Sequence, residues 1–164
     1  MTHSRAWQRM LSGRCLDILA PSPLDIEIED IALGLARIAR WNGQTIGEHG
    51  YSVAQHSIFV AELAAVEDPD VPPQCLLAAL LHDAPEYVCS DLVTPLKRAV
   101  GASYTEIEQR MTTAVHMAFN LPASLPPDWR LAIDRADRFA AFIEAVRLAG
   151  FPEKEARQQF GFRC

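Results

Sequence analysis

The sequence predicts an all-α protein, a single compact helical bundle. Apolar residues recur at helical spacing in several segments, and no segment alternates apolar and polar residues as a half-buried strand does. Turns containing proline separate these segments. A chain of 164 residues is long enough to bury one core. We therefore expect a single domain over residues 1–164, with an irregular segment, residues 1–29, packed on it.

The expected helices follow that segment in order. Asp30 is a candidate N-cap for a short first helix, and Tyr51-Ser52 leads into a second. The third, over about residues 74–87, is apolar almost all round, which is typical of a helix at the centre of a domain. A loop with Ser90-Asp91 and Thr94-Pro95 comes next. Later helices are expected to end near residue 120, to cover about residues 128–148, and to follow Pro152.

Composition excludes several classes of function. The net charge of −6 provides no broad basic field, so we expect no duplex nucleic acid as partner, and an anionic substrate must be attracted locally. No segment has the ~20 apolar residues that cross a bilayer, and the first residues lack a signal-peptide core. The four cysteines form no C-x-x-C pair. We expect a cytoplasmic protein with reduced thiols and no membrane partner.

The most informative residues are His82 and Asp83, which interrupt the most apolar predicted helix. An unpaired charge is costly to bury, so such residues need partners. Glu86 follows at helical spacing and would share their face. Two interpretations stay open on this observation: the three side chains form a functional site, or they hydrogen-bond to neighbouring helices as structural groups.

Two residues on other predicted helices extend this constellation. His56 lies among apolar residues of the second helix, and Asp137 lies among arginines of the last long one. Taken singly, the first is more often a core or surface histidine and the second a salt-bridged surface residue. Taken with His82 and Asp83, they can supply a metal site with two nitrogen and two oxygen ligands.

These residues resemble a known family. The order His56 … His82-Asp83 … Asp137 is similar to the H…HD…D signature of the HD superfamily of phosphohydrolases. The string from Leu81 to Lys97 resembles the pattern H-D-A-x-E-x-x-x-x-D-L-x-T-P-x-K of its bacterial 5′-deoxynucleotidase branch. Arg40-Trp41 and Gln55-His56-Ser57 match two upstream segments, with Gln55 replacing a glutamate, and Ala136-Asp137 fits the last motif. The resemblance covers about residues 35–147.

The resemblance implies one divalent metal ion, held by His56, His82, Asp83 and Asp137. Asp134 competes for the last position, but its sequence context favours Asp137. Mixed imidazole and carboxylate ligands suit Mn²⁺, Co²⁺, Fe²⁺, Ni²⁺ or Zn²⁺. Members with two metals carry extra histidines between the doublet and the last aspartate; here only His116 lies there, and we interpret it as structural.

Roles for the remaining residues combine this resemblance with their chemistry. Glu86 is expected to orient the attacking water or shuttle a proton, and Asp91 to serve the departing sugar oxygen, unless it is only a turn residue. The substrate contacts expected are Arg40 as a bidentate phosphate clamp, Trp41 against the sugar, and Thr94 and Lys97 near the phosphate.

The predicted activity is hydrolysis of (deoxy)nucleoside 5′-monophosphates by metal-activated water. One alternative is an HD phosphohydrolase for another nucleotide, a cyclic phosphodiester or a non-nucleotide phosphate ester, because the family's long insertion before the last motif is missing here. Another is a non-catalytic metal and nucleotide sensor; a plain helical interaction domain would leave the His-Asp doublet unexplained. A homodimer is expected from the resemblance.

Overall fold

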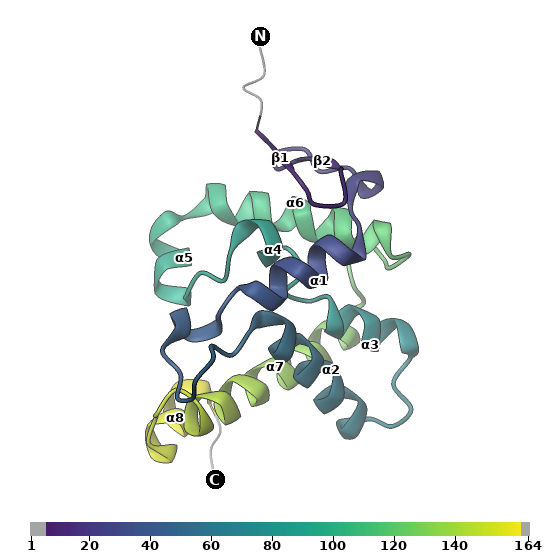
Figure 1. The fold of residues 1–164 in the computed structure, drawn as a ribbon. Helices are drawn as coiled ribbons and strands as arrows, with labels where there is room; N and C mark the ends of the chain where they lie inside the picture. Colours follow the sequence, from purple (N-terminus) through teal and green to yellow (C-terminus); the bar gives the residue numbers. More distant parts are fainter. Residues whose placement is uncertain (1–5, 162–164) are drawn as a thin grey trace.

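The computed structural model describes residues 6–161 and shows a helical body with a small hairpin at one end (Figure 1), which confirms the predicted all-α class. The helices are α1 (Ile28–Arg37), α2 (Val53–Glu67), α3 (Pro73–Leu80), α4 (Glu86–Cys89), α5 (Thr94–Val100), α6 (Ala102–Ala118), α7 (Pro127–Arg147) and α8 (Glu153–Phe160). Two short 3-10 turns, η1 (Pro23–Asp25) and η2 (Arg40–Gly43), precede α1 and α2. That residues 1–164 form a single domain stays a prediction.

Helix α2 lies at the centre of the fold, where it packs on α7, α3 and α1. Its buried face contains Val53, Val60 and Ala64, which recur at the spacing of one side of a helix. His56 belongs to the same face and is fully buried. The imidazole ring of His56 therefore occupies a position between α2 and α7 where an apolar core residue is expected.

The start of α2 agrees with the prediction. Ser52 is the N-cap; its hydroxyl accepts a hydrogen bond from the backbone N–H of Gln55 at 3.2 Å, and Gln55 Oε1 accepts from Ser52 N at 2.9 Å. Such a reciprocal capping box can be made by glutamine as well as by glutamate. The glutamine that departs from the family pattern thus preserves the helix start that orients His56.

The third predicted helix is shorter than expected, and its prediction over residues 74–87 was wrong. Helix α3 ends at Leu80, a turn covers residues 81–85, and α4 begins at Glu86. Pro85 explains the break, because its ring lacks an N–H and would clash with the carbonyl group of Leu81 if the helix continued. His82 and Asp83 consequently project from a tight turn.

Helix α1 holds that turn from the other side. A Cβ on Gly34 would lie 2.8 Å from the Cβ of Tyr87, closer than real Cβ contacts allow. The glycine therefore permits α1 and α4 to approach, and the contact fixes the segment that follows the His82-Asp83 turn.

Of the predicted irregular segment, residues 6–29 are more regular than predicted, and residues 1–5 lie outside the described part of the chain. Strands β1 (Trp7–Arg9) and β2 (Cys15–Asp17) form an antiparallel hairpin, with Gln8 opposite Leu16. Three-residue strands are too short to show an alternating pattern, which is why the sequence did not reveal them. The prediction that Asp30 is the N-cap of the first helix was wrong, because α1 begins at Ile28. The Asp30 side chain instead accepts hydrogen bonds from the backbone and hydroxyl of Ser12.

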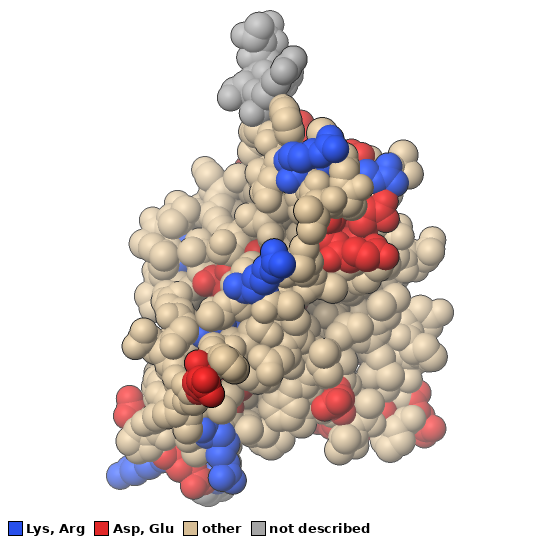
Figure 2. Space-filling view, in the orientation of Figure 1, with Lys and Arg blue, Asp and Glu red and all other residues tan. Residues whose placement is uncertain are grey.

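Thr94 and Pro95 begin α5 and do not belong to the predicted loop, because proline is compatible with a first helical turn. The later helices α6, α7 and α8 lie where they were expected. Among the described helices, none combines the length and apolarity needed to cross a membrane. On the face in Figure 2, lysine and arginine side chains form separate patches among acidic and uncharged ones, in keeping with the net charge of −6.

Candidate metal centre and phosphate site

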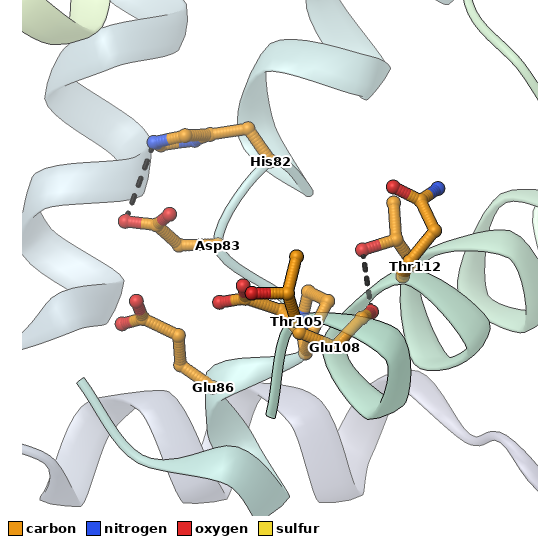
Figure 3. A pocket seen from close by; sticks show the side chains of 8 residues that line it. His82, Asp83, Glu86, Thr105, Glu108 and Thr112 are labelled. Carbon is orange, nitrogen blue, oxygen red and sulfur yellow. Dashed lines mark hydrogen bonds and ion pairs between the residues drawn. The ribbon is translucent and has the colours of Figure 1, made fainter. Parts of the chain in front are cut away.

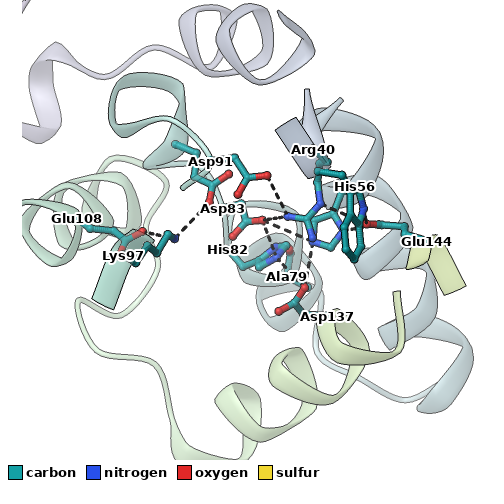
Figure 4. Close-up of polar contacts among 12 residues, drawn as sticks. Arg40, His56, Ala79, His82, Asp83, Asp91, Lys97, Glu108, Asp137 and Glu144 are labelled. Atoms are coloured by element: carbon teal, nitrogen blue, oxygen red, sulfur yellow. Dashed lines mark hydrogen bonds and ion pairs between the residues drawn. The ribbon is translucent and has the colours of Figure 1, made fainter. Parts of the chain in front are cut away.

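Two helices and a turn bring three of the four predicted ligands together. His56 comes from α2, His82 from the turn after α3 and Asp137 from α7, and their ligand atoms all lie within 4.8 Å of one another. His56 Nε2 lies 3.1 Å from Asp137 Oδ1, and His82 Nε2 lies 3.9 Å from the same oxygen. Figure 4 shows the three side chains converging from their separate elements. Such a group could hold a metal ion.

Asp83 is adjacent to this group without belonging to it. Its Oδ2 atom lies 3.5 Å from His56 Nε2 and 3.3 Å from His82 Nε2, but also 3.3 Å from Nη1 of Arg40. The carboxylate is therefore shared between the imidazole pair and the guanidinium. It stands at the border between the candidate metal centre and the candidate phosphate clamp.

The hydrogen bonds of the two histidines suit metal binding. His56 Nδ1 lies 2.6 Å from Glu144 Oε1, and His82 Nδ1 lies 2.8 Å from the carbonyl oxygen of Ala79, so both Nδ1 atoms are placed to donate. The two Nε2 atoms are buried and have no hydrogen-bond partner among residues 6–161. A buried, unsatisfied ring nitrogen is costly, and a cation would satisfy both. The residues present thus fit a divalent metal.

The charges of the residues at the centre also favour a bound cation. Burial lowers the pKa of His82, but the carboxylates of Asp83 and Asp137 outweigh it and raise the pKa to about 9. Burial likewise raises the pKa of Asp137, yet its contact with the His56 imidazole at 3.1 Å and the charge of His82 hold it below its ordinary value. In the metal-free protein the imidazoles therefore take up protons to balance the carboxylates. A cation can replace those protons.

Arg40 and Trp41 reach the centre from η2. The backbone N–H of Arg40 bonds to the carbonyl of Tyr51 at 2.8 Å, which closes the loop before α2 and sets Arg40 beside His56. Arg40 Nη1 lies 3.8 Å from Asp91, and Nε donates to Glu144 at 3.3 Å. Trp41 has φ 58° and ψ 24°, a left-handed conformation that is strained for a non-glycine residue.

Glu86 and Asp91 lie close enough to Asp83 for the three charges to interact. Glu86 is 3% exposed, and its Oε2 has no hydrogen-bond partner in the described part of the chain. Burial, with the charges of Asp83 and Asp91, raises its pKa to about 8. A cavity of about 120 Å³ adjoins it, lined also by polar residues of α6; Figure 3 shows the Glu86 carboxylate pointing to the side where Asp83 lies.

The predicted phosphate contacts of α5 are differently placed. Lys97 Nζ donates to Glu108 at 2.8 Å and lies 3.5 Å from Glu86, so its charge is engaged by two carboxylates. Thr94 is exposed at the first residue of α5, and its side chain takes part in none of the hydrogen bonds found within residues 6–161. The structure brings Lys97 next to Glu86, whereas Thr94 is not linked to the centre.

One residue at the centre was missed by the sequence analysis. Glu144 of α7 is 2% exposed and contacts His56, Arg40 and Trp41. A signal existed: Glu144 follows Asp137 by seven residues, two helical turns, so both lie on one face of the predicted helix. It was overlooked because a single glutamate in a long helix is usually solvent-exposed.

Asp134 and His116, the two other residues considered as metal ligands, lie in different surroundings from the residues at the centre. Asp134 is exposed on α7, whereas Asp137 faces His56. His116 is 5% exposed in α6, and burial lowers its pKa; only the backbone carbonyls of Pro122 and Ala123 oppose that effect. Its surroundings therefore lack the carboxylates that surround His56.

The sequence of the chain is similar to those of known proteins. Residues 31–150 match the family described as 5′-deoxynucleotidase YfbR-like. An uncharacterised protein of Rhodobacter capsulatus is 58% identical over 157 residues, which cover 96% of this chain and 80% of that protein. The uncharacterised protein YfdR of Escherichia coli is 37% identical over 98 residues, 60% of this chain and 49% of that protein. The chain belongs to the YfbR-like 5′-deoxynucleotidase family of HD-domain proteins, as its motifs predicted.

Proposed function

We propose that the protein is a metal-dependent phosphohydrolase that removes the phosphate from deoxynucleoside 5′-monophosphates. The observation that carries this proposal is the group formed by His56, His82 and Asp137, with two unsatisfied Nε2 atoms beside an arginine and a buried glutamate. The family supports a nucleotide phosphate ester as substrate.

His56, His82, Asp83 and Asp137 would hold one divalent cation of the Mn²⁺ to Zn²⁺ series. When bound, such a cation polarises the phosphoryl group and lowers the pKa of a water molecule. Asp83 is the one proposed ligand that also touches Arg40, so a phosphate bound beside it would meet the guanidinium directly.

Arg40 has the role of phosphate clamp in this proposal. Its guanidinium lies among Asp83, Asp91 and Glu144, which hold it in one orientation before substrate arrives. A planar fork of N–H donors matches two phosphate oxygens. Trp41, the next residue, is positioned by its bond to Glu144 and would lie against the sugar.

Glu86 and Asp91 would move the protons. Water attacks the phosphorus and the bond from phosphorus to the sugar oxygen breaks; Glu86 accepts the proton of the water, and Asp91 gives one to the departing oxygen. Burial raises the pKa of Asp91, although Arg40 opposes it, and a raised pKa favours the protonated carboxyl that a donor requires. The polar cavity beside Glu86 has room for water.

The test is phosphate release from a panel of ribo- and deoxyribonucleoside monophosphates, with Mn²⁺, Co²⁺ or EDTA. Wild type is compared with Asp137→Asn and with Asp134→Asn, a matched control three residues earlier on the same helix. We expect metal-dependent turnover of deoxynucleotides that Asp137→Asn reduces by at least roughly 100-fold, since even partners of metal ligands contribute roughly 10- to 100-fold, and that Asp134→Asn leaves unchanged.

If the wild type with Mn²⁺ bound releases phosphate from none of the monophosphates, the assignment of nucleoside monophosphates as substrates is refuted. Cyclic phosphodiesters and non-nucleotide phosphate esters would then be assayed with the same variants. Equal activity of Asp137→Asn and wild type would refute the metal centre itself.

A further inference from the structure

Glu144 is the most completely bonded carboxylate at the centre. Oε1 lies 2.6 Å from His56 Nδ1, while Oε2 accepts from Trp41 Nε1 at 3.1 Å and from Arg40 Nε at 3.3 Å. Figure 4 shows the Glu144 carboxylate beside His56, on the side away from Asp83. The side chain is 2% exposed. A carboxylate so deeply buried is tolerated because three N–H donors compensate for the loss of water.

The bond to Oε1 decides which nitrogen of His56 can bind a cation. An ionised carboxylate accepts hydrogen bonds but does not donate them, so Nδ1 of His56 must carry the proton. In the neutral ring, Nε2 then presents its lone pair toward Asp137 and His82. Carboxylates in this position orient ligating histidines and raise their basicity.

The bonds to Oε2 act on the other side of the centre. Trp41 and Asn42 both have positive φ angles, of 58° and 51°, which cost free energy in residues with a side chain. The strain persists because the surroundings hold the loop: Glu144 binds the indole N–H, and the indole ring packs on Phe151 at 5.8 Å between centroids. The same carboxylate thereby orients Arg40 and Trp41.

We propose that Glu144 is a positioning residue that couples the metal centre to the substrate clamp through one carboxylate. Oε1 fixes the tautomer of His56, and Oε2 holds Arg40 and Trp41 in the conformation that meets the phosphate and sugar. The roles of His56 and Arg40 rest on the proposed function; the three contacts of Glu144 do not.

Glu144→Gln is the informative change, because glutamine has nearly the same shape but only one acceptor oxygen. Three N–H groups face this side chain, so the amide NH₂ must point at a donor whichever way it turns. Two donors face the Oε2 position and one faces Oε1, which directs the amide oxygen to Arg40 and Trp41. His56 Nδ1 then meets an NH₂ group and accepts from it, which moves the ring proton to Nε2.

The experiment measures Mn²⁺ affinity by calorimetry on the purified full chain. The control is Asp30→Asn, which also replaces a buried, hydrogen-bonded carboxylate, on α1 and outside the centre. We expect Glu144→Gln to weaken Mn²⁺ binding by roughly 10- to 100-fold and Asp30→Asn to leave it unchanged. Equal Mn²⁺ affinities in Glu144→Gln and wild type would overturn the proposal.

A measurement on the wild type covers the case in which Glu144→Gln does not fold. In the Zn²⁺-loaded protein, nitrogen NMR should show a slowly exchanging proton on His56 Nδ1, close in space to the Glu144 methylene protons. A Zn²⁺-loaded His56 without that proton would overturn the proposal by itself.

Kinetics with a deoxynucleoside monophosphate separate this inference from the proposed function. Saturating Glu144→Gln with Mn²⁺ should leave a KM for the nucleotide at least several-fold above the wild-type value, because a neutral amide oxygen holds Arg40 and Trp41 less strongly than the carboxylate does. A wild type that binds Mn²⁺ but hydrolyses no nucleotide refutes the function and leaves the calorimetric test of Glu144 standing.

Discussion

Two glutamates of similar burial lie beside the candidate metal centre. Glu86 is 3% exposed at the start of α4, and Glu144 is 2% exposed in α7. Burial acts on both to raise the pKa. For Glu144 the hydrogen bond from His56 and the charge of Arg40 outweigh burial and lower the pKa; for Glu86 the charges of Asp83 and Asp91 add to burial and raise it to about 8.

The difference teaches that burial alone does not assign a role to a carboxyl group. Glu144 receives three N–H donors and stays an anion that orients its partners. Glu86 accepts one long hydrogen bond, from Lys97 at 3.5 Å, and its other oxygen has no hydrogen bond among the described residues. Its charge state therefore changes near neutral pH, which suits a group that exchanges protons with water.

The largest expected effect is on catalysis and separates the two glutamates directly. Glu86→Gln should lower kcat by roughly 10²- to 10⁴-fold, the range for loss of a general base, with Mn²⁺ affinity close to that of wild type. In Glu144→Gln the main effect should instead be weakened Mn²⁺ binding. Steady-state kinetics and calorimetry on both variants measure kcat and Mn²⁺ affinity. A Glu86→Gln variant with weakened Mn²⁺ binding and a Glu144→Gln variant with only a lowered kcat would contradict the roles assigned to the two glutamates.

A second prediction concerns stability in the absence of metal. Between the ordinary glutamate pKa of 4.5 and about 8, Glu86 is protonated in the folded chain and ionised in the unfolded one. The folded state then binds more protons, so its stability falls as pH rises through this window, by at most about 1.4 kcal/mol per pH unit.

Glu86→Gln lacks this titration and should therefore become progressively more stable than wild type from pH 5 to pH 8. Urea unfolding in EDTA at several pH values measures the difference. A difference that does not change with pH would show that Glu86 is ionised throughout, like Glu144.

The smallest expected effect comes from Lys97. Its charge lowers the pKa of Glu86, so Lys97→Met should raise that pKa and move the acidic limb of the kcat/KM profile toward higher pH, by up to about one unit. Lys97→Arg keeps the charge and serves as control. A profile unchanged in Lys97→Met would mean that Lys97 serves only its contact with Glu108.

Most helices were predictable because their signals are local. The Ser52 cap and the apolar spacing of α6 and α7 lie within a few residues of the elements they define. The break at residues 81–85 also has a local signal: Pro85 prevents the helix from continuing, whereas the apolar residues before it favour a longer helix. The three-residue strands β1 and β2 are too short for any periodicity.

By itself, the sequence determined the helical class, the family motifs and the ligand-type residues His56, His82, Asp83 and Asp137, because spacing along the chain encodes each of them. Only the tertiary structure decided which partners these residues meet. His56 and Glu144 are 88 residues apart, and their contact depends on how α2 packs against α7. Likewise, Lys97 is paired with Glu108 because α5 folds back on α6. Electrostatic roles follow from such distances, which no local pattern contains.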